Sequence, residues 1–246
     1  MTNIHPCVIA LQKNEDIFIS EWVNYHLNLG FEHIFIIDNN SIDNRLISNS
    51  PNVTIIPFNN IEFKNLTNVS YGENEQVIAY NYCLEYLKLT HYNYVANIDI
   101  DEFIVLKYHS DIHDFIRDTL YEPNINRVDL IWTLYDDNDN IYEDNSKGVM
   151  EQYTRIQLKE PTNNAMNYQL AQGLNFWSKS IIKLYPWTTY RWSHGPIDNI
   201  NYPNNMLSKD YATINHYRTK CLESFLKRKN HQLNIIRDHG TMFDMF

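Results

Sequence analysis

Tyr94-Val95-Ala96-Asn97-Ile98-Asp99-Ile100-Asp101-Glu102-Phe103 is an apolar run that passes into acidic residues, and it carries the clearest structural signal in the chain. The run at 94–98 predicts a buried strand. Two aspartates at spacing i and i+2 would lie on one side of an extended backbone. Open parallel sheets bind ligands beyond the carboxyl ends of their strands. We therefore expect Asp99 and Asp101 at a ligand-binding edge of a sheet.

The same two aspartates indicate what that edge would bind. Neighbouring carboxylates repel each other unless a cation neutralises them. Mg²⁺ and Mn²⁺ prefer oxygen ligands and often combine one or two carboxylates with phosphate oxygens. The pair predicts a divalent cation that bridges to a phosphate, against the alternative that both aspartates only solvate the end of a strand.

The chain before this stretch alternates short apolar runs with helical patterns, which is typical of βαβ units and a parallel sheet. Phe18, Trp22 and Tyr25 recur at helical spacing, with Asn14 expected as the N-cap and Gly30 as the stop. A second helix is expected from about Glu73. The expected strands of this half are 7–11, 33–37, 53–56 and 94–98.

The rest of the chain is less regular and richer in strand patterns. An acidic loop at 136–144 is expected to be solvated, and a terminal helix to span about 220–236. No Pro-, Gly- or Ser-rich linker divides the chain, so we expect one domain over 1–246. The strand candidates here are 127–134, 176–184, 188–193 and 212–217.

Composition excludes several classes of protein. The 246 residues carry a formal net charge of −10, which argues against nucleic acid or an anionic membrane as partner. Cys7, Cys83 and Cys221 form no C-x-x-C pair, so neither a zinc site nor a disulfide framework is indicated. No stretch reaches the roughly 20 apolar residues of a membrane span, and the start lacks the pattern of a signal peptide. A soluble, cytoplasmic protein is expected.

Two later segments carry histidines at predicted strand ends. His216 lies near the end of the run at 212–217, and Lys220 lies near the N-terminus of the expected terminal helix. A neutral imidazole could bind a metal there, and an ammonium could bind phosphate. His194 lies before the Gly195-Pro196 turn. The alternative is that these histidines are structural and that Lys220 is merely solvated.

Several motifs occur in the order found in one group of enzymes. Lys13-Asn14-Glu15, Glu21-Trp22 and Tyr25-His26 are followed by Ile37-Asp38-Asn39-Asn40-Ser41. Later come Gln76, the acidic segment at 99–103, Trp132, Lys179-Ser180, His194 and the segment from His216 to Lys220. As an ordered set, the chain resembles the family 92 and family 2-like glycosyltransferases over nearly its whole length. These have the GT-A fold, an α/β fold whose central, mostly parallel mixed sheet is flanked by helices, with a smaller acceptor-side region.

The resemblance implies a metal-dependent, inverting transfer of a sugar from a nucleoside-diphosphate donor, UDP in particular, to a hydroxyl of a glycan, glycoprotein or small molecule. Residues 1–105 would bind the nucleotide sugar and 106–246 the acceptor. Asp99, Asp101 and His216 would bind Mn²⁺ or Mg²⁺. The expected donor-binding residues are Lys13, Asn14, Glu15, Asp38, Asn39, Gln76, Asp99 and Lys220.

The acceptor side departs from the family pattern. Cys221 stands where the family usually has Ser, and the segment after Trp132 lacks the usual Phe-Gly. An acceptor hydroxyl needs a base within hydrogen-bond reach. Glu151, Asp198 and His194 are the unranked candidates.

Other functions stay open at this point. A nucleotidyltransferase shares the acidic sheet edge but usually has a glycine-rich loop after its first strand, whereas this chain has Gln12-Lys13-Asn14-Glu15. An inactive nucleotide- or sugar-binding module would be free to lose the Asp99/Asp101 pair, which is intact here.

Overall fold

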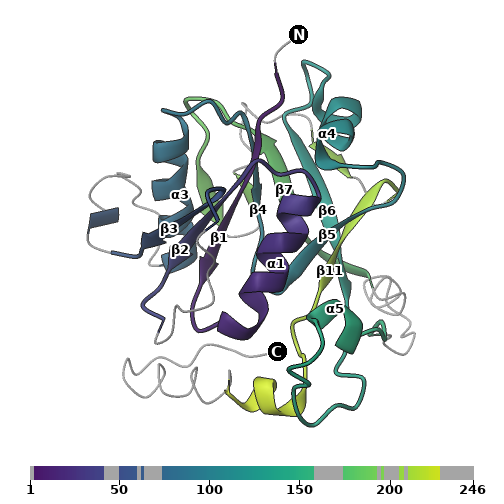
Figure 1. Ribbon diagram of the computed structural model, residues 1–246. Coiled ribbons are helices and arrows are strands. Elements are labelled where there is room, and N and C mark those ends of the chain that lie inside the picture. Colours follow the sequence, from purple (N-terminus) through teal and green to yellow (C-terminus); the bar gives the residue numbers. More distant parts are fainter. Residues whose placement is uncertain are drawn as a thin grey trace.

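The computed structural model describes residues 3–41, 50–59, 62–63, 74–157, 174–192, 195–196, 205–207 and 210–227. Its centre is a twisted sheet with helices on both faces (Figure 1). The path across the sheet runs β3-β2-β1-β4-β7-β6-β11-β5. The predicted α/β class, with a mostly parallel mixed sheet flanked by helices, is confirmed.

The first half of the chain builds the parallel part of the sheet. Its strands are β1 (Pro6–Gln12), β2 (His33–Asp38), β3 (Val53–Pro57) and β4 (Tyr94–Asn97), and the pairs β1–β2, β1–β4 and β2–β3 are all parallel. Parallel strands align their carboxyl ends, so the segments that follow β1, β2 and β4 meet at one edge.

The second half continues the same sheet in mixed directions. β7 (Leu174–Lys183) lies antiparallel between β4 and β6 (Arg127–Leu134). β11 (Ala212–His216) runs parallel to β6 and antiparallel to β5 (Glu102–Leu106). β10 (Asn205–Leu207) pairs with the start of β6, and β8 (Tyr190–Trp192) and β9 (Gly195–Pro196) form a separate small sheet.

Helices cover both faces because β1 is apolar on both. Val8 and Ala10 belong to the core cluster under α1 (Asp16–Asn28) and α4 (Ile112–Leu120). Cys7 and Ile9 belong to a second cluster under α3 (Glu75–Leu87). A strand buried on both faces reads as a continuous apolar run, which is how 7–11 was predicted. A short helix, α5 (Val149–Gln152), lies near the lower ends of α1 and β11 (Figure 1).

Two sequence-based expectations about local structure are wrong. Asn14 does not cap α1: it has φ 57°, and Glu15 takes the N-cap position without a side-chain hydrogen bond. Asp99 and Asp101 do not lie on an extended backbone, because the chain turns there and the Glu102 N–H donates to the Asp99 carbonyl at 3.0 Å. The described part of the terminal helix, 222–227, begins close to the expected start at Lys220, which itself has φ 51°.

β5 and α4 are among the elements that were not predicted, together with the short elements α5, β9 and β10. β5 follows the acidic turn at once, so its apolar residues looked like the tail of β4. α4 does carry a readable start signal, since the Asp111 side chain accepts from the Asp114 N–H at 2.9 Å. The second helix begins at Glu75 behind its N-cap Asn74, close to the expected position.

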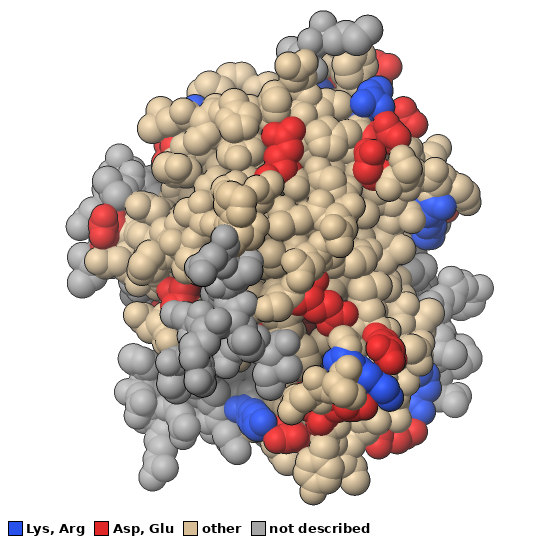
Figure 2. Space-filling model, in the orientation of Figure 1, with Lys and Arg blue, Asp and Glu red and all other residues tan. Residues whose placement is uncertain are grey.

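Charge on the face in Figure 2 is scattered: acidic and basic side chains interleave over its lower part, and its middle is mostly uncharged. Two aspartates of the predicted acidic loop, Asp136 and Asp139, form ion pairs with Arg155, which follows the loop, at 2.6 and 2.7 Å. No helix in the described part of the chain combines the length and apolar character that crossing a bilayer requires.

Candidate active site

The acidic turn after β4 is held by its own last carboxylate. Glu102 Oε2 accepts from the Asp99 N–H at 2.8 Å, and the Glu102 N–H donates to the Asp99 carbonyl at 3.0 Å. These reciprocal bonds close the turn. The backbone of Asp99 is therefore fixed by two hydrogen bonds to Glu102.

The Asp99 carboxylate lies among three donors from distant parts of the chain. Oδ1 accepts from Gln76 Nε2 at 2.5 Å and from the Tyr80 hydroxyl at 3.1 Å, both on α3. Oδ2 lies 3.0 Å from Lys179 Nζ on β7. Burial and then the Asp99 charge raise the pKa of Tyr80 well above its ordinary value, so this hydroxyl keeps its proton and donates.

Lys179 is a landmark of the family pattern to which the sequence assigns no role, yet it is central to the site. Its side chain is fully buried, and Nζ also lies 3.9 Å from Glu102 Oε2. Burial lowers the pKa of Lys179, but the carboxylates of Asp99, Glu102 and Asp101 outweigh it and raise the pKa above its ordinary value. A lysine in the interior of a predicted strand, shortly before the apolar pair Ile181-Ile182, was the signal that could have identified it.

Glu102 is the second site residue that the sequence left without a role. It is fully buried, and burial raises the pKa of its carboxyl well above the ordinary value, against the opposing effect of Lys179. Its Oε1 has no hydrogen-bond partner among the described residues. Glu102 therefore stabilises the turn and Lys179 from inside the protein.

Asp101 meets His216, as the sequence suggested. His216 Nε2 lies 3.5 Å from Asp101 Oδ1, and both side chains are largely buried. The Tyr217 N–H donates to the Asp101 carbonyl at 2.9 Å, so the end of β11 is tied to the acidic turn. The Trp132 ring on β6 packs against the imidazole with centroids 4.3 Å apart. His216 Nδ1 has no hydrogen-bond partner in the described part of the chain.

The predicted metal ligands do not converge as a trio. Among the described residues, the single group of three possible ligands whose atoms all lie within 4.8 Å of one another is elsewhere, at His5, Glu32 and His91. Asp99 is turned to Lys179, whereas Asp101 and His216 face each other. The structure thus brings two of the three predicted ligands together.

A cavity of about 300 Å³ opens over the carboxyl ends of β1, β2 and β4. Asp99 and Asp101 form one wall of it, and the loop after β1 forms another. Five of the predicted donor-binding residues line the cavity: Lys13, Glu15, Asn39, Gln76 and Asp99.

The remaining donor-binding candidates lie around this cavity in other ways. Asn14 is exposed, and its N–H donates to Ser41 Oγ at 2.9 Å. Asp38 is buried and accepts a hydrogen bond from the Gln12 side chain. This bond joins the ends of β1 and β2. Lys220 is 2% exposed, with Nζ 3.1 Å from Glu15 Oε2 and 4.1 Å above the Phe18 ring.

A larger hollow of about 670 Å³ adjoins the first and shares Asn39 with it. Aromatic and amide side chains line it, among them Phe58, Asn59 and Tyr82. The Asn39 side-chain amide donates to Glu75 Oε2 at 2.9 Å across its wall. The two cavities together offer a polar end beside the acidic turn and a partly aromatic end beside β3.

Of the candidate bases, one can be located. Glu151 is exposed on α5 and does not line the 300 Å³ cavity. The start of α5 is bound by Glu21, whose carboxylate accepts a hydrogen bond from the Val149 N–H at 2.6 Å. His194 and Asp198 lie outside the described residues.

The chain matches a protein family over nearly its whole length. The family model described as glycosyltransferase family 92 aligns with residues 3–242. A glycosyltransferase family 92 protein of Oryza sativa subsp. japonica is 26% identical over 130 residues, which are 50% of this chain and 20% of that protein. The match thus spans about a fifth of the length of this curated relative.

Solved structures are similar at a greater distance. A mycobacterial protein aligns over 91% of this chain and 70% of its own, at 12% identity and a TM-score of 0.45. The galactosyltransferase LgtC in complex with donor and acceptor sugar analogs aligns over 74% of this chain and 59% of its own, at 12% identity and a TM-score of 0.34. At this distance the family model, and not the superpositions, carries the assignment.

Proposed function

This chain belongs to glycosyltransferase family 92, and from that premise we propose that it transfers a sugar from a uridine diphosphate donor to an acceptor hydroxyl with a divalent cation. The acceptor class is a glycan, glycoprotein or small molecule. The observation that carries the proposal is the meeting of Asp99, Asp101, His216 and Lys179 at the carboxyl ends of the parallel strands. That is the edge at which open α/β sheets bind ligands.

The donor nucleotide is assigned to the two adjoining cavities. The 300 Å³ cavity has the acidic turn and Gln76 on its walls, and suits the diphosphate with its cation. The 670 Å³ hollow has Phe58 and Tyr82 beside amide groups, and suits a ring that needs both stacking and hydrogen bonds. Asn39 touches both cavities and is the expected contact between them.

The residues of the acidic turn fit a divalent cation. Asp101 and His216 offer one oxygen and one nitrogen 3.5 Å apart, and two adjacent ligands of an octahedral ion with bonds of about 2.1 Å lie about 3 Å apart. The two aspartates Asp99 and Asp101 face the single ammonium of Lys179, so local charge also favours a cation. Mn²⁺ or Mg²⁺ would be held by Asp101 and His216, with Asp99 beside them. When bound, the ion supplies a Lewis acid that stabilises the charge of the departing diphosphate.

The protein's own residues prepare the site for that charge. Lys179, Gln76 and Tyr80 hold the Asp99 carboxylate in one orientation. Lys220 lies buried behind the cavity, paired with Glu15, which lines it, and we propose that its ammonium opposes negative charge that develops on the diphosphate. A preorganised site of this kind loses little energy to rearrangement during the reaction.

The transfer is proposed as an inverting single displacement. It requires a base on the acceptor side that removes the hydroxyl proton as the sugar–phosphate bond breaks. Glu151, Asp198 and His194 remain the candidates for that base. We further propose that residues 1–105 bind the donor and that 106–246 bind the acceptor, within one domain.

The decisive experiment incubates the protein with a panel of nucleotide sugars and Mn²⁺ and detects the released nucleoside diphosphate. Release from a UDP-sugar that stops on chelation, and that fails in Asp101→Asn, supports the proposal. Binding of donor without release favours an inactive binding module. Release of pyrophosphate from a nucleoside triphosphate and a sugar phosphate would instead favour a nucleotidyltransferase.

A further inference from the structure

A second group of potential metal ligands lies at the opposite ends of the parallel strands. His5 immediately precedes β1, Glu32 immediately precedes β2, and His91 lies in the loop before β4. These are the amino ends of the parallel strands, and the candidate active site is at their carboxyl ends. A seven-residue strand separates the two edges by roughly 20 Å. The group is therefore independent of the proposed function.

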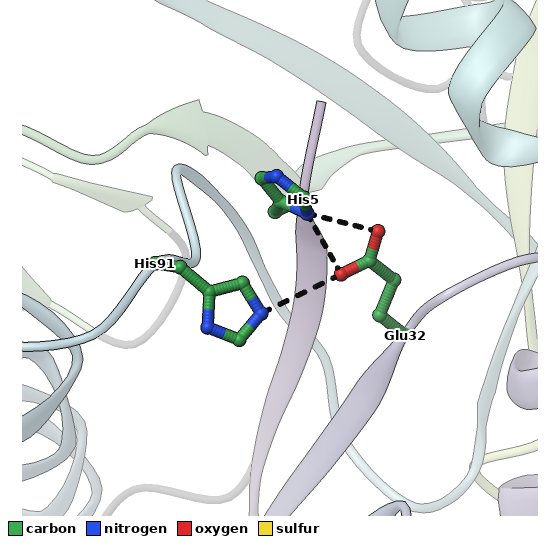
Figure 3. A group of neighbouring side chains, drawn as sticks. All are labelled: His5, Glu32 and His91. Atoms are coloured by element: carbon green, nitrogen blue, oxygen red, sulfur yellow. Dashed lines mark hydrogen bonds and ion pairs between the residues drawn. The ribbon is translucent and has the colours of Figure 1, made fainter. Parts of the chain in front are cut away.

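The three side chains point toward one another (Figure 3). His5 Nδ1 lies 3.1 and 3.0 Å from the two Glu32 oxygens, and His91 Nε2 lies 3.8 Å from Glu32 Oε2. One ligand atom from each residue lies within 4.8 Å of the others. Ligands of a tetrahedral Zn²⁺ ion with bonds of about 2.0–2.1 Å are about 3.3 Å apart, so small shifts of the side chains suffice to bind one.

The backbone on which these side chains stand is already ordered by hydrogen bonds. The His5 N–H donates to Asn93 Oδ1 at 2.8 Å, and the Asn93 N–H donates to the His5 carbonyl at 3.1 Å. The Glu32 N–H donates to the Pro6 carbonyl at 2.9 Å. These bonds join the three ligand-bearing segments, and a preorganised ligand set binds a metal more tightly than a mobile one.

The side chains combine this support with access to solvent. Those of His5 and Glu32 are about one third exposed, and that of His91 is 62% exposed. The His91 ring packs on the Tyr92 ring and meets the His5 ring edge-on, with centroids 4.2 and 5.0 Å apart. An ion could thus enter from water, and the packing of the rings would restrict the motion of the two histidine side chains that bind it.

We propose that His5, Glu32 and His91 form a zinc site of three protein ligands, with the fourth position left for water. Two imidazoles and one carboxylate are a ligand set that suits Zn²⁺, whereas Mg²⁺ and Ca²⁺ prefer oxygen alone. The ion would tie the starts of β1 and β2 to the loop before β4. Occupation would therefore stabilise the folded chain, since a ligand that binds only the folded state shifts unfolding.

Zinc binding is tested by calorimetric titration of ZnCl₂ into full-length protein made without a polyhistidine tag and stripped of metal. The wild type is expected to bind one Zn²⁺ at this site and to unfold at a higher temperature with zinc. His91→Ala and Glu32→Gln are each expected to weaken zinc affinity by about 100-fold or more, because even outer residues of metal sites contribute 10- to 100-fold. Co²⁺ in place of zinc should give the visible spectrum of a tetrahedral ion in the wild type, and this spectrum should be lost in His91→Ala and Glu32→Gln.

Two control variants separate this site from others. His109→Gln removes a histidine that pairs with Asp118 at 3.1 Å outside the trio, and should leave zinc affinity unchanged. Asp101→Asn alters the candidate active site and should also retain this zinc ion. Unchanged zinc affinity in both His91→Ala and Glu32→Gln, or loss of all zinc binding in Asp101→Asn, would overturn the proposal.

Discussion

At the scale of single residues, the site depends on one buried cation among three carboxylates. Lys179 balances Asp99 at 3.0 Å and Glu102 at 3.9 Å. This leaves Asp101 to face His216 at 3.5 Å. The two aspartates of the turn therefore have different surroundings, and their replacement should have different consequences.

Asp101→Asn should abolish transfer and leave the fold intact. The substitution keeps the shape of the side chain but removes a charge from the proposed cation site, and metal stabilisation of a leaving group is worth several kcal/mol. We expect turnover with Mn²⁺ to fall by at least about 100-fold. Asp118→Asn, at an exposed aspartate paired with His109, is the control. Near-normal turnover in Asp101→Asn would contradict the role of Asp101 as a ligand of the cation.

His216 and Lys220 should separate metal binding from nucleotide binding. His216→Ala should weaken Mn²⁺ affinity, because it removes one of two facing ligands. Lys220→Ala should weaken binding of uridine diphosphate without changing the Mn²⁺ requirement. Titration of Mn²⁺ in the presence of uridine diphosphate measures both. An unchanged metal affinity in His216→Ala would leave the imidazole with a packing role against Trp132.

Lys179→Met should destabilise the folded protein by about 3–5 kcal/mol, because loss of one partner leaves buried charges uncompensated. Urea unfolding measures the difference. Lys183→Met on the same strand is the matched control. Its Nζ donates to the Glu122 carbonyl in an exposed hydrogen bond, so the substitution should cost about 0.5 kcal/mol or less. Equal effects of the two substitutions would contradict the role given to Lys179.

At the scale of elements, side chains of α1 form hydrogen bonds with the backbone groups along the outer edge of β5. The Trp22 indole N–H donates to the Glu102 carbonyl at 2.8 Å, and the Tyr25 hydroxyl donates to the Ile104 carbonyl at 2.7 Å. His26 Nε2 accepts from the Ile104 N–H at 3.4 Å. β5 ends the path across the sheet, and an uncovered edge strand invites mispairing. One face of α1 thus covers the strand that begins at the acidic turn.

His26 should make stability fall in acid. Burial lowers its pKa to about 3, against the opposing hydrogen bond to the Trp22 carbonyl. An unfolded histidine titrates near 6.5, so the unfolded chain binds more protons between about pH 6.5 and 3. The stability from neutral His26 is present above that window and is lost at about 1.4 kcal/mol per pH unit as pH falls through it.

Unfolding free energies of wild type and His26→Gln, measured by urea at several pH values, check this slope. The variant should be less stable at pH 7 and should lose stability less steeply in acid. Parallel pH profiles for wild type and His26→Gln would show that His26 does not contribute.

At the scale of the whole molecule, the two halves share one sheet and one core. β4 of the first half pairs with β7 of the second, and β5 pairs with β11. The core cluster under α1 joins Val8 and Phe103 to Trp132 and Ile214. A division near residue 105 would therefore cut through one sheet and would not separate two folding units.

Residues 1–105 should accordingly fail to fold alone. Their isolated fragment would expose the edges of β4 and β5 and half of a shared core. We expect no cooperative urea transition from the fragment. The full chain should unfold in a single transition, seen alike by tryptophan fluorescence and circular dichroism. A cooperative transition in the fragment would contradict the single-domain arrangement.

Much of the architecture could be predicted from the sequence, because strands and helices leave periodic apolar patterns in adjacent residues. The bounds of β6 matched the prediction, and those of β1 to β3 came within one residue. The acidic turn was located correctly, although its backbone was expected to be extended. Departures occurred where a local signal was weak, as at the break between β4 and β5.

The partners of the acidic residues were decided only by the tertiary structure. Lys179 reaches Asp99 because β7 inserts antiparallel beside β4, and His216 reaches Asp101 because β11 pairs with β5. His5, Glu32 and His91 meet because three parallel strands align their amino ends. Periodicity along the chain specifies the elements, but the order in which strands pair depends on contacts between residues far apart in sequence. Those long-range contacts are what bring the candidate ligands together.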